Sequence, residues 1–293
     1  MSIRKYEIFD AAVQYGNFAK AAVYLNLTPS AVSHAINDLE EEIDLKLFSR
    51  NKKGVVLTAE GRRLLPFIRN IQKAEQVFGQ EVDQIHGLQT GTVILCAPGN
   101  ICTKWLPGLI TAFRQRHQNI GIKIVEGNHR EIISWIEEDR ADIAFLTGEV
   151  PTNFIKLASL EDSLICVAPA YDTLQKPTVS IEDLRKMNIL VNSVDENPEV
   201  PDFLNRNHIK YDSRFSVDRP DALVSLVEAN FGACILPSIS EFSKDLKVRK
   251  YAIEEEDKYP ITIVVNIQFK SAPATAAMSR FILEYIEEGK LKL

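Results

Sequence analysis

The sequence predicts an α/β protein that starts with a winged helix-turn-helix, continues through one long helix and ends in a two-lobed α/β domain. Three observations predict this fold. Two short helical patterns meet at a tight break within residues 17–40, a strand pattern with a basic turn follows at residues 47–58, and apolar strands alternate with amphipathic helices from residue 92 onward. Together they separate a small helical unit from a larger unit built around a sheet.

Residues 17–40 predict the helix-turn-helix. Asn17 is a suitable N-cap for the first helix, and Asn26 ends it because Asn tolerates the left-handed conformation. Thr28 caps the second helix, and Pro29 takes its first position, where a missing N–H costs nothing. The expected buried stripe of this second helix is Ala31, Val32, Ala35, Ile36 and Leu39. The opposite face carries small polar residues suited to base edges in a major groove, namely Ser30, Ser33, His34 and Asn37.

The neighbouring segments favour DNA binding over an unrelated pair of helices, which many proteins contain. Residues 3–15 form another amphipathic pattern that closes a three-helix core, and residues 47–58 predict a hairpin, the wing. A basic wing supplies phosphate contacts, whereas the alternative is a turn that is simply solvated. The basic residues near the turn are Arg50, Lys52, Lys53, Arg62 and Arg63.

Composition is that of an ordinary globular protein. The 293 residues carry a formal net charge of −6, with 45% apolar and 25% charged residues. No run of about 18 apolar residues predicts a membrane span, and the N-terminal amphipathic helix with acidic residues is unlike a signal peptide, so a cytoplasmic protein with no membrane partner is expected. Four scattered cysteines without a C-x-x-C pair predict neither a zinc site nor a disulfide framework. We expect no cofactor and no metal site.

Residues 58 to about 88 predict one long helix that begins after Thr58. About thirty residues would span roughly 45 Å, and a helix of this length cannot bury its apolar seam alone. The partner is either a second copy of the chain, giving a dimer through residues 62–86, or the chain's own C-terminal domain; the dimer is favoured. The seam residues are Leu64, Ile68, Ile71, Phe78, Val82 and Ile85.

The remainder alternates strand and helix in two similar stretches. A βαβ rhythm predicts a mostly parallel sheet, and the last helix, residues 274–288, is expected to return to the first lobe. Expected strands cover residues 92–97, 120–126, 142–146, 163–168, 189–192, 214–217, 233–236 and 261–268. Expected helices cover residues 106–117, 130–138, 181–185, 202–207 and 220–229.

Several motifs, in this order and spacing, resemble the LysR-type transcriptional regulators. They are Phe18-Ala19-Lys20-Ala21-Ala22, Thr28-Pro29-Ser30-Ala31-Val32-Ser33-His34, Leu39-Glu40-Glu41-Glu42, Leu47-Phe48-Ser49-Arg50 and Leu57-Thr58-Ala59-Glu60-Gly61. The resemblance implies a DNA-binding domain at 1–58, a linker and dimerisation helix at 59–88, and an effector-binding domain at 89–293 that is similar to a periplasmic solute-binding protein. Lobe I would then hold about 91–162 and 268–293, and lobe II about 163–267.

The same resemblance implies a regulator that binds double-stranded DNA at an inverted repeat, as a dimer and, in the family, as a tetramer. Its activity would respond to a small-molecule effector bound between the lobes. The sequence departs from the family where glycine is usual, at Asp44, Asp139 and Asn230. Each is a predicted helix end in the left-handed region, which Asp and Asn tolerate best among residues with a side chain.

Ligands of α/β lobes bind beyond the carboxyl ends of the strands. If Thr103 begins the helix after the first strand, its N–H groups suit an anion such as a carboxylate. The absence of arginine from these loops disfavours a highly charged effector, and the alternative is that their polar residues are simple turn formers. The candidate effector-binding residues are Asn100, Ile101, Cys102, Thr103, Gly127, Asn128, Thr147, Asn192 and Ser193.

Other functions are less well supported. Cys102 suggests a redox switch, but an ordinary thiol is favoured because only Lys104 nearby would lower its pKa. An enzyme is disfavoured by the lack of G-x-G-x-x-G, P-loop, G-x-S-x-G and H-E-x-x-H motifs, so we expect no catalytic residues. A solute-binding protein is opposed by the N-terminal winged helix. The effector, the target genes and the direction of regulation stay open.

Overall fold

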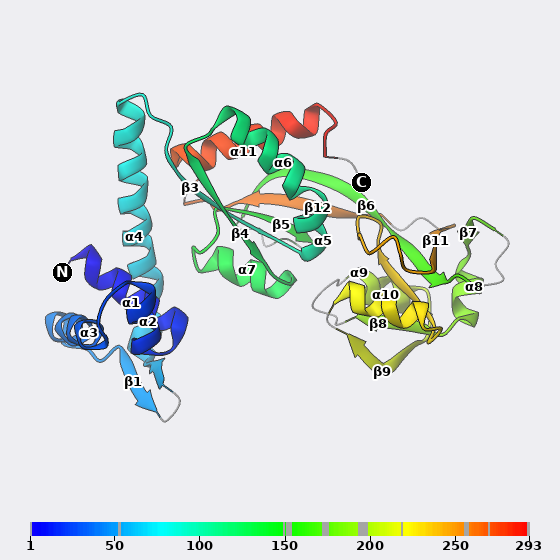
Figure 1. Cartoon of the computed structure of the whole chain (residues 1–293), viewed down its shortest axis with the longest axis horizontal. Helices are drawn as coiled ribbons and strands as arrows, with labels where there is room; N and C mark the ends of the chain where they lie inside the picture. The colour runs from blue at the N-terminus through cyan, green and yellow to red at the C-terminus, as the bar shows by residue number, and fades with distance from the viewer. Residues whose placement is uncertain are drawn as a thin grey trace. The chain divides into compact units, whose positions relative to one another are not determined.

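The computed structural model describes residues 2–51, 54–148, 150, 154–171, 176–192, 199–217, 219–254, 258–268 and 270–291. The chain divides into two compact units. Unit 1 comprises residues 1–88 with 138–140, and unit 2 comprises residues 89–137 and 141–293. Figure 1 shows them in blue to cyan and in green to red.

Unit 1 has the elements of a winged helix-turn-helix followed by a long helix (Figure 1). Asn17, Thr28 and Thr58 each cap a helix by accepting hydrogen bonds from its first backbone amides, as the sequence predicts. Asn26 adopts the left-handed conformation at a φ of 53°. The elements are α1 (Ile3–Tyr15), α2 (Phe18–Tyr24), α3 (Pro29–Ile43), β1 (Phe48–Asn51), β2 (Gly54–Leu57) and α4 (Ala59–Ile85).

The core of unit 1 forms where the three short helices meet the start of α4. Val32, Ile36 and Leu39 of α3 are buried, as expected. The prediction was wrong for Ala31, which is exposed, and Ala35 is half-buried. Both residues lie at the margin of the stripe, since Val32, Ile36 and Leu39 already span the face that α1 covers.

The wing is fixed to the helical core by a close backbone approach. The Val55 amide donates to the Gly16 carbonyl at 2.9 Å. A Cβ at Gly54 would lie 2.2 Å from the same carbonyl oxygen, and the φ of Gly54 is +142°, so this position requires glycine. The end of α1 therefore sets where the wing begins.

Unit 2 contains a 10-stranded sheet in the order β4-β3-β5-β12-β6-β10-β8-β9, with β11 paired to β6 and to β7. Pairs β3–β4, β3–β5, β8–β9 and β8–β10 are parallel, whereas β12 and β6 run antiparallel to their neighbours. The sheet is thus mixed rather than mostly parallel. The strands are β3 (Gly91–Ala97), β4 (Ile120–Glu126), β5 (Ile143–Thr147), β6 (Ile155–Pro169), β7 (Thr178–Val179), β8 (Ile189–Asn192), β9 (Tyr211–Val217), β10 (Ala233–Pro237), β11 (Val248–Ile253) and β12 (Lys258–Val265).

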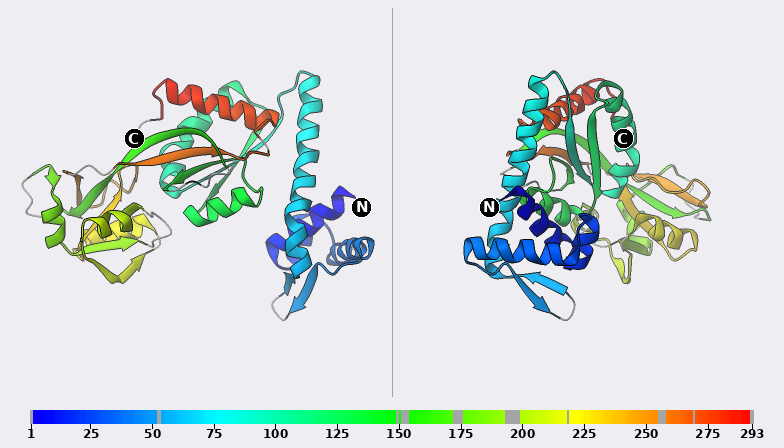
Figure 2. Two further views of the ribbon diagram at one scale, coloured as in Figure 1. Left: turned by 180° about the vertical axis from the view of Figure 1, so that it is seen from behind. Right: turned by 60° about the vertical axis from the view of Figure 1, so that its left-hand side comes forward.

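Helices cover both faces of this sheet. We call β3–β5 with α5–α7 and α11 lobe I, and β8–β10 with α8–α10 lobe II. In lobe I, α6 and α11 lie side by side on one face and α7 covers the other (Figure 2). The helices are α5 (Gly99–Lys104), α6 (Leu106–Arg116), α7 (His129–Glu137), α8 (Ile181–Lys186), α9 (Glu199–Arg206), α10 (Pro220–Glu228) and α11 (Pro273–Glu287).

Strands β6 and β12 connect the lobes. Strand β6 pairs with β12 as far as Ser163 and with β10 and β11 from Leu164 onward. Sequence alternation predicted only residues 163–168 of this strand, because residues 155–162 follow a polar stretch and mix apolar with charged side chains. The strand predicted at residues 261–268 is β12, which begins and ends earlier, at Lys258 and Val265. The sequence prediction missed β7, β11 and α5 because each is short or largely polar.

The predicted left-handed helix ends are confirmed. Asp44, Asp139 and Asn230 have φ values of 52°, 56° and 65°. Among the residues that the structure describes, no helix combines the length and apolar character needed to cross a membrane. Within the same residues, no cluster of His, Cys, Asp or Glu side chains is arranged to hold a metal ion.

Candidate functional site

Helix α3 presents a polar face to solvent. Ser30, His34 and Asn37 are exposed, and Ser33 is half-buried. The Ser30 hydroxyl shares a hydrogen bond with that of Thr28 at 3.0 Å, and the His34 Nδ1 lies 3.5 Å from an Asp38 carboxylate oxygen. Because Val32, Ile36 and Leu39 bury the other side, these residues form the polar, outward face of the second helix of the helix-turn-helix.

The acidic end of α3 is partly neutralised by α1. The Lys5 ammonium lies 2.7 Å from Glu42 and 3.6 Å from Asp38. The hydrogen bond to Glu42 raises the pKa of Lys5, and the same bond lowers the pKa of Glu42. These pairs lower the repulsion that the carboxylates would exert on a phosphate backbone.

The basic wing is only partly described. The backbone of Arg50 belongs to β1, but its side chain, Lys52 and Lys53 lie outside the described residues. Next to the wing, the Arg62 guanidinium donates to the Leu57 carbonyl at 2.8 Å. Arg62 therefore holds the end of β2 against the first turn of α4.

Glu40 is a buried carboxylate that the sequence did not single out. It is 5% exposed and accepts hydrogen bonds from the Leu47 and Phe48 amides at 2.8 and 3.1 Å. The Lys46 ammonium donates to its other oxygen at 2.5 Å. Burial alone would raise the pKa of Glu40, but Lys46 and the two amides together lower it. Glu40 thus ties α3 to the segment that leads into the wing.

Helix α4 divides the predicted seam into two parts. Ile68 is buried and Leu64 half-buried against the helical core of unit 1. The remaining seam residues are exposed, and so is Phe67 at 65%. The exposed apolar residues of α4 are Phe67, Ile71, Phe78, Val82 and Ile85, which we call the α4 apolar face.

In unit 2, the carboxyl ends of β3, β4 and β5 lie at one edge of the sheet, as predicted. The parallel register pairs Ala97 with Glu126, and the Gly127 amide donates to the Ala97 carbonyl at 3.3 Å. Asn100 and Cys102 are half-buried here. Asn192 ends β8 with its side chain outside the described residues, and Ser193 lies outside them altogether.

Two expectations about the first strand end were wrong. Thr103 does not begin a helix: it lies in the last turn of α5, and its hydroxyl donates to the Gly99 and Asn100 carbonyls at 3.0 Å. The helix starts at Gly99 instead, where the Glu126 carboxylate lies so close that a Cβ would be 2.8 Å from its Oε1. The Ile101 side chain is fully buried in the apolar core, so it lines no ligand site.

Asn128 has a structural role that its position at a strand end did not reveal. Its side-chain oxygen accepts from the Glu131 amide, while the Glu131 carboxylate accepts from the Asn128 amide, both at 3.0 Å. This reciprocal pair caps α7. A Cβ at Gly127 would lie 2.4 Å from Trp135, so residue 127 is a packing glycine.

The end of β5 lies beside two polar side chains that the sequence did not reveal. The His129 ring lies near the Thr147 backbone, and burial lowers the pKa of His129. The Glu199 carboxylate, at the start of α9, lies near the Thr147 hydroxyl. Glu199 is 7% exposed, yet neither of its oxygens has a hydrogen-bond partner of normal geometry. Sequence reasoning missed it because nothing local marks an acidic helix start as buried.

A second buried carboxylate, Asp162, is fully satisfied. It lies on β6 where that strand leaves β12. It accepts from the Tyr259 hydroxyl and the Ser238 hydroxyl, both at 2.5 Å, and from the Ser163 amide at 2.8 Å. Burial, followed by the charge of Asp162, raises the pKa of Tyr259, so this phenol stays a donor.

The cysteines show no sign of activation. Burial raises the pKa of the Cys102 thiol to about 11, and the Glu126 carboxylate acts in the same direction. A reactive thiol requires the opposite shift. Cys166 and Cys234 are fully buried, and burial raises the pKa of Cys234. Because Cys166 pairs with Ile235 and Cys234 with Val167, the two side chains point to opposite faces of the sheet.

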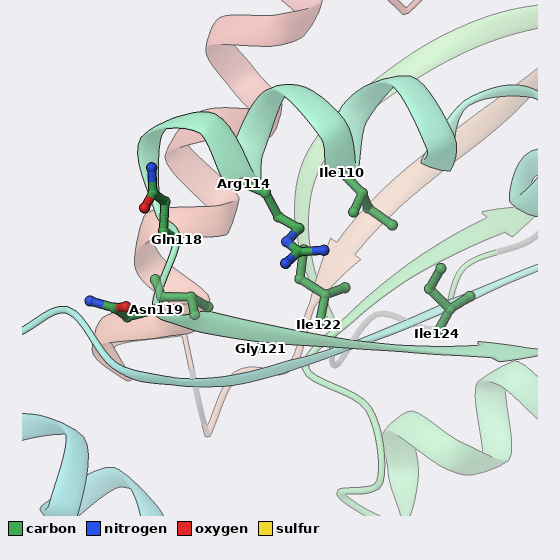
Figure 3. A pocket seen from close by; sticks show the side chains of 8 residues that line it. Ile110, Arg114, Gln118, Asn119, Gly121, Ile122 and Ile124 are labelled. Carbon is green, nitrogen blue, oxygen red and sulfur yellow. The ribbon is translucent and has the colours of Figure 1, made fainter.

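A groove of about 420 Å³ lies elsewhere, between α6 and the edge strand β4 (Figure 3). Arg114 extends from α6 above Ile122, and Ile124 is 46% exposed at one end (Figure 3). Its lining residues are mostly exposed, which describes an open surface rather than an enclosed ligand site. It includes none of the predicted effector-binding residues.

The winged helix-turn-helix of unit 1 and the two-lobed α/β fold of unit 2 are together typical of a DNA-binding protein with a ligand-binding domain. The family model "Bacterial regulatory helix-turn-helix protein, lysR family" matches residues 3–62, and the model "LysR substrate binding domain" matches residues 86–287. The chain belongs to the LysR family of transcriptional regulators, as its motifs predicted.

Known relatives agree with this assignment. The "Probable RuBisCO transcriptional regulator" of Cyanidioschyzon merolae is 28% identical over 284 residues, covering 90% of this chain and 93% of the relative. Full-length OxyR of Pseudomonas aeruginosa, in a variant form, has the same fold, with a TM-score of 0.73, 14% identity, and coverage of 96% of this chain and 94% of that one. Full-length CbnR bound to its target DNA gives a TM-score of 0.69, 18% identity, and coverage of 97% and 99%.

Proposed function

We propose that this regulator binds an inverted-repeat operator through α3 and the wing. The observation that carries the proposal is the solvent-facing polar side of α3, which the helical core leaves free. Base edges would be contacted from Ser33, His34 and Asn37, with Ser30 at the groove edge. Arg50, Lys52 and Lys53 would contact phosphates.

We propose that two copies pair through the α4 apolar face. Five large apolar side chains in this face are exposed, which is more than a helix leaves in water without a partner. A twofold dimer places two α3 helices on half-sites about one helical turn apart, or a multiple of it. Tetramers formed from two such dimers are the further expectation from the family.

We propose that residues 1–58 bind DNA, that 59–88 dimerise, and that 89–293 bind the effector, with lobe boundaries as predicted from the sequence. The effector would lie at the strand ends, near Asn100, Cys102, Gly127 and Thr147. The half-burial of Asn100 and Cys102 and the burial of Thr147 support this place. The family consists of transcriptional regulators, and we propose no catalytic step.

Footprinting of the full chain on the DNA upstream of its own gene tests the DNA-binding proposal. Wild type should protect an inverted repeat, and a Ser33→Ala, His34→Ala double variant should lose that protection. His86→Ala, which changes an exposed histidine beyond the end of α4, is the matched control and should protect like wild type. Equal protection by all three proteins would place base recognition elsewhere.

A further inference from the structure

Neither oxygen of the Glu199 carboxylate has a hydrogen-bond partner of normal geometry in the part of the chain that the structure describes. The residue is 7% exposed, and it forms no ion pair there. A buried carboxylate left in this state costs several kcal/mol unless something neutralises it. Asp162 shows the contrast, since four donors surround that carboxylate. Glu199 is therefore open to a donor from outside the chain.

Its position is where a ligand of this domain would lie. Glu199 is the first residue of α9 in lobe II, and its carboxylate lies near the Thr147 hydroxyl at the end of β5 in lobe I. Thr147 is 4% exposed and shares its sheet edge with Glu126. A ligand that contacts Glu199 would therefore touch both lobes at the carboxyl ends of the strands.

The electrostatic surroundings favour a cation. Burial raises the pKa of Glu199, and Asp202 and Asp162 add to the effect, while its own backbone amide and the Thr147 hydroxyl act against it. The charged groups that shift this pKa are both carboxylates, and no positive side chain is among them. The start of α5, which would otherwise attract an anion, already faces the Glu126 carboxylate.

We propose, resting on the effector-binding function proposed above, that Glu199 recognises the effector and that the effector is a small primary amine, bound through its ammonium group. The ammonium N–H groups supply the donors that the carboxylate lacks, and the charge offsets its repulsion with Asp162 and Asp202. Charge-assisted hydrogen bonds of this type are about twice as strong as neutral ones. Closure of the lobes on this contact would connect occupancy to the arrangement of the dimer.

The affinity of an ammonium ligand and that of a carboxylate ligand should depend on pH in opposite ways. An ammonium binds ionised Glu199, so its affinity rises as pH increases through the pKa of that group. A carboxylate would need protonated Glu199 and would bind more tightly as pH falls. The other titratable groups around this site are Asp202 on the same helix, Asp162 on β6, Tyr259 on β12 and His129 on α7.

Binding to the full-length protein is measured with matched four-carbon probes, 1,4-diaminobutane, 4-aminobutanoate and succinate, and with a panel of primary amines of increasing size. Calorimetry and thermal unfolding are followed at several pH values from about pH 5 to about pH 8, since burial raises the pKa of Glu199 above that of an ordinary carboxyl group. Glu199→Gln keeps the size and removes the charge. Glu182→Gln removes one charge from an exposed position on α8 of the same lobe and serves as the control.

At least one amine should bind wild type more tightly at the higher pH, and Glu199→Gln should weaken it by about tenfold or more. Glu182→Gln should change its affinity by less than about threefold. The proposal is overturned if no amine of the panel binds, if Glu199→Gln binds it equally well, or if succinate binds more tightly as pH falls.

A measurement without ligand tests the same carboxylate. Because the folded pKa of Glu199 is raised above 4.5, its favourable contribution is complete below that value and is lost as pH rises through the folded pKa. Glu199→Gln should therefore unfold at a higher temperature than wild type at about pH 8, and the two should converge toward pH 5. A lower unfolding temperature for the variant at high pH would show that the chain itself satisfies Glu199. Footprinting separates this proposal from the regulator function, since DNA protection without amine binding overturns only the ligand class.

Discussion

At the scale of single residues, Glu40 decides how the wing is held. Its carboxylate accepts from two successive amides, those of Leu47 and Phe48, and from the Lys46 ammonium. Leu47 ends the turn between α3 and β1, and Phe48 is the first residue of β1. One side chain near the end of α3 therefore sets the direction in which the chain enters the hairpin.

We expect Glu40→Gln to loosen this turn. The variant loses the charge-assisted part of the bonds and leaves Lys46 without its partner, which costs about 1–3 kcal/mol locally. Hydrogen exchange of the Leu47 and Phe48 amides should accelerate by about 5- to 150-fold at neutral pH. Glu41→Gln, which changes the exposed neighbouring carboxylate, is the control and should leave both amides protected.

The effect of Glu40→Gln depends on pH with a defined sign. The pKa of Glu40 is lowered from 4.5, so its stabilising contribution is present above that value and is lost as pH falls through the folded pKa. Wild type and variant should therefore differ at neutral pH and become alike in acid. Exchange rates that differ equally at all pH values would contradict the assigned role of the ionised carboxylate.

At the scale of elements, α4 carries two apolar surfaces, one near its start and one toward its end. Ile68 closes the core of unit 1, whereas Phe78 and Ile85 are 70% and 81% exposed. The same helix therefore completes the DNA-binding fold at its start and offers a pairing surface toward its end. The sequence pattern predicted one seam, interrupted at Glu75, because spacing alone does not reveal which residues the three short helices cover.

We expect Phe78→Glu to separate the dimer. Two Phe side chains would be lost from a twofold interface, each contributing about 1.5–3 kcal/mol, so the dissociation constant should rise by about 10² to 10⁴-fold. Sedimentation of the full chain at low micromolar concentration measures this change. Gln76→Glu adds the same charge to an exposed position on the other side of α4 and should leave the dimer intact. Loss of the dimer in both variants would mean that charge, not the apolar face, is responsible.

At the scale of the whole molecule, the two units have separate cores. The apolar clusters of unit 1 draw on residues 6–68, and those of unit 2 begin at Val93. Unit 2 is held together by β6, which pairs with β12 in its first part and with β10 and β11 in its second, and by the hydrogen bonds of Asp162 between these two parts. Each unit therefore has what a folded domain needs.

We expect residues 89–293 expressed alone to unfold in one cooperative transition and to retain the amine response of the full chain, because Glu199, Thr147 and Asp162 all belong to unit 2. Calorimetry and the binding assay described above measure both properties. The fragment should give no DNA footprint. A fragment without a cooperative transition would show that unit 2 depends on unit 1 for its fold.

Much of this fold was predictable from local sequence. Caps at Asn17, Thr28 and Thr58, and left-handed ends at Asp44, Asp139 and Asn230, depend on side chains that act on their own backbone. The motifs of the winged helix-turn-helix likewise identified the family before any coordinates. Local chemistry determines these features because the interacting groups are within a few residues of each other.

Tertiary structure alone decided the rest. The extent of β6, the burial of Ile101 and the true start of α5 at Gly99 depend on what packs against those residues from distant segments. Glu40 and Glu199 resemble ordinary surface acids in the sequence, yet both are buried. Glu40 accepts three hydrogen bonds, whereas neither oxygen of Glu199 has a hydrogen-bond partner of normal geometry among the described residues. Burial is a property of the assembled chain, and so the sequence determined the protein's class while the fold determined which charges can select its ligand.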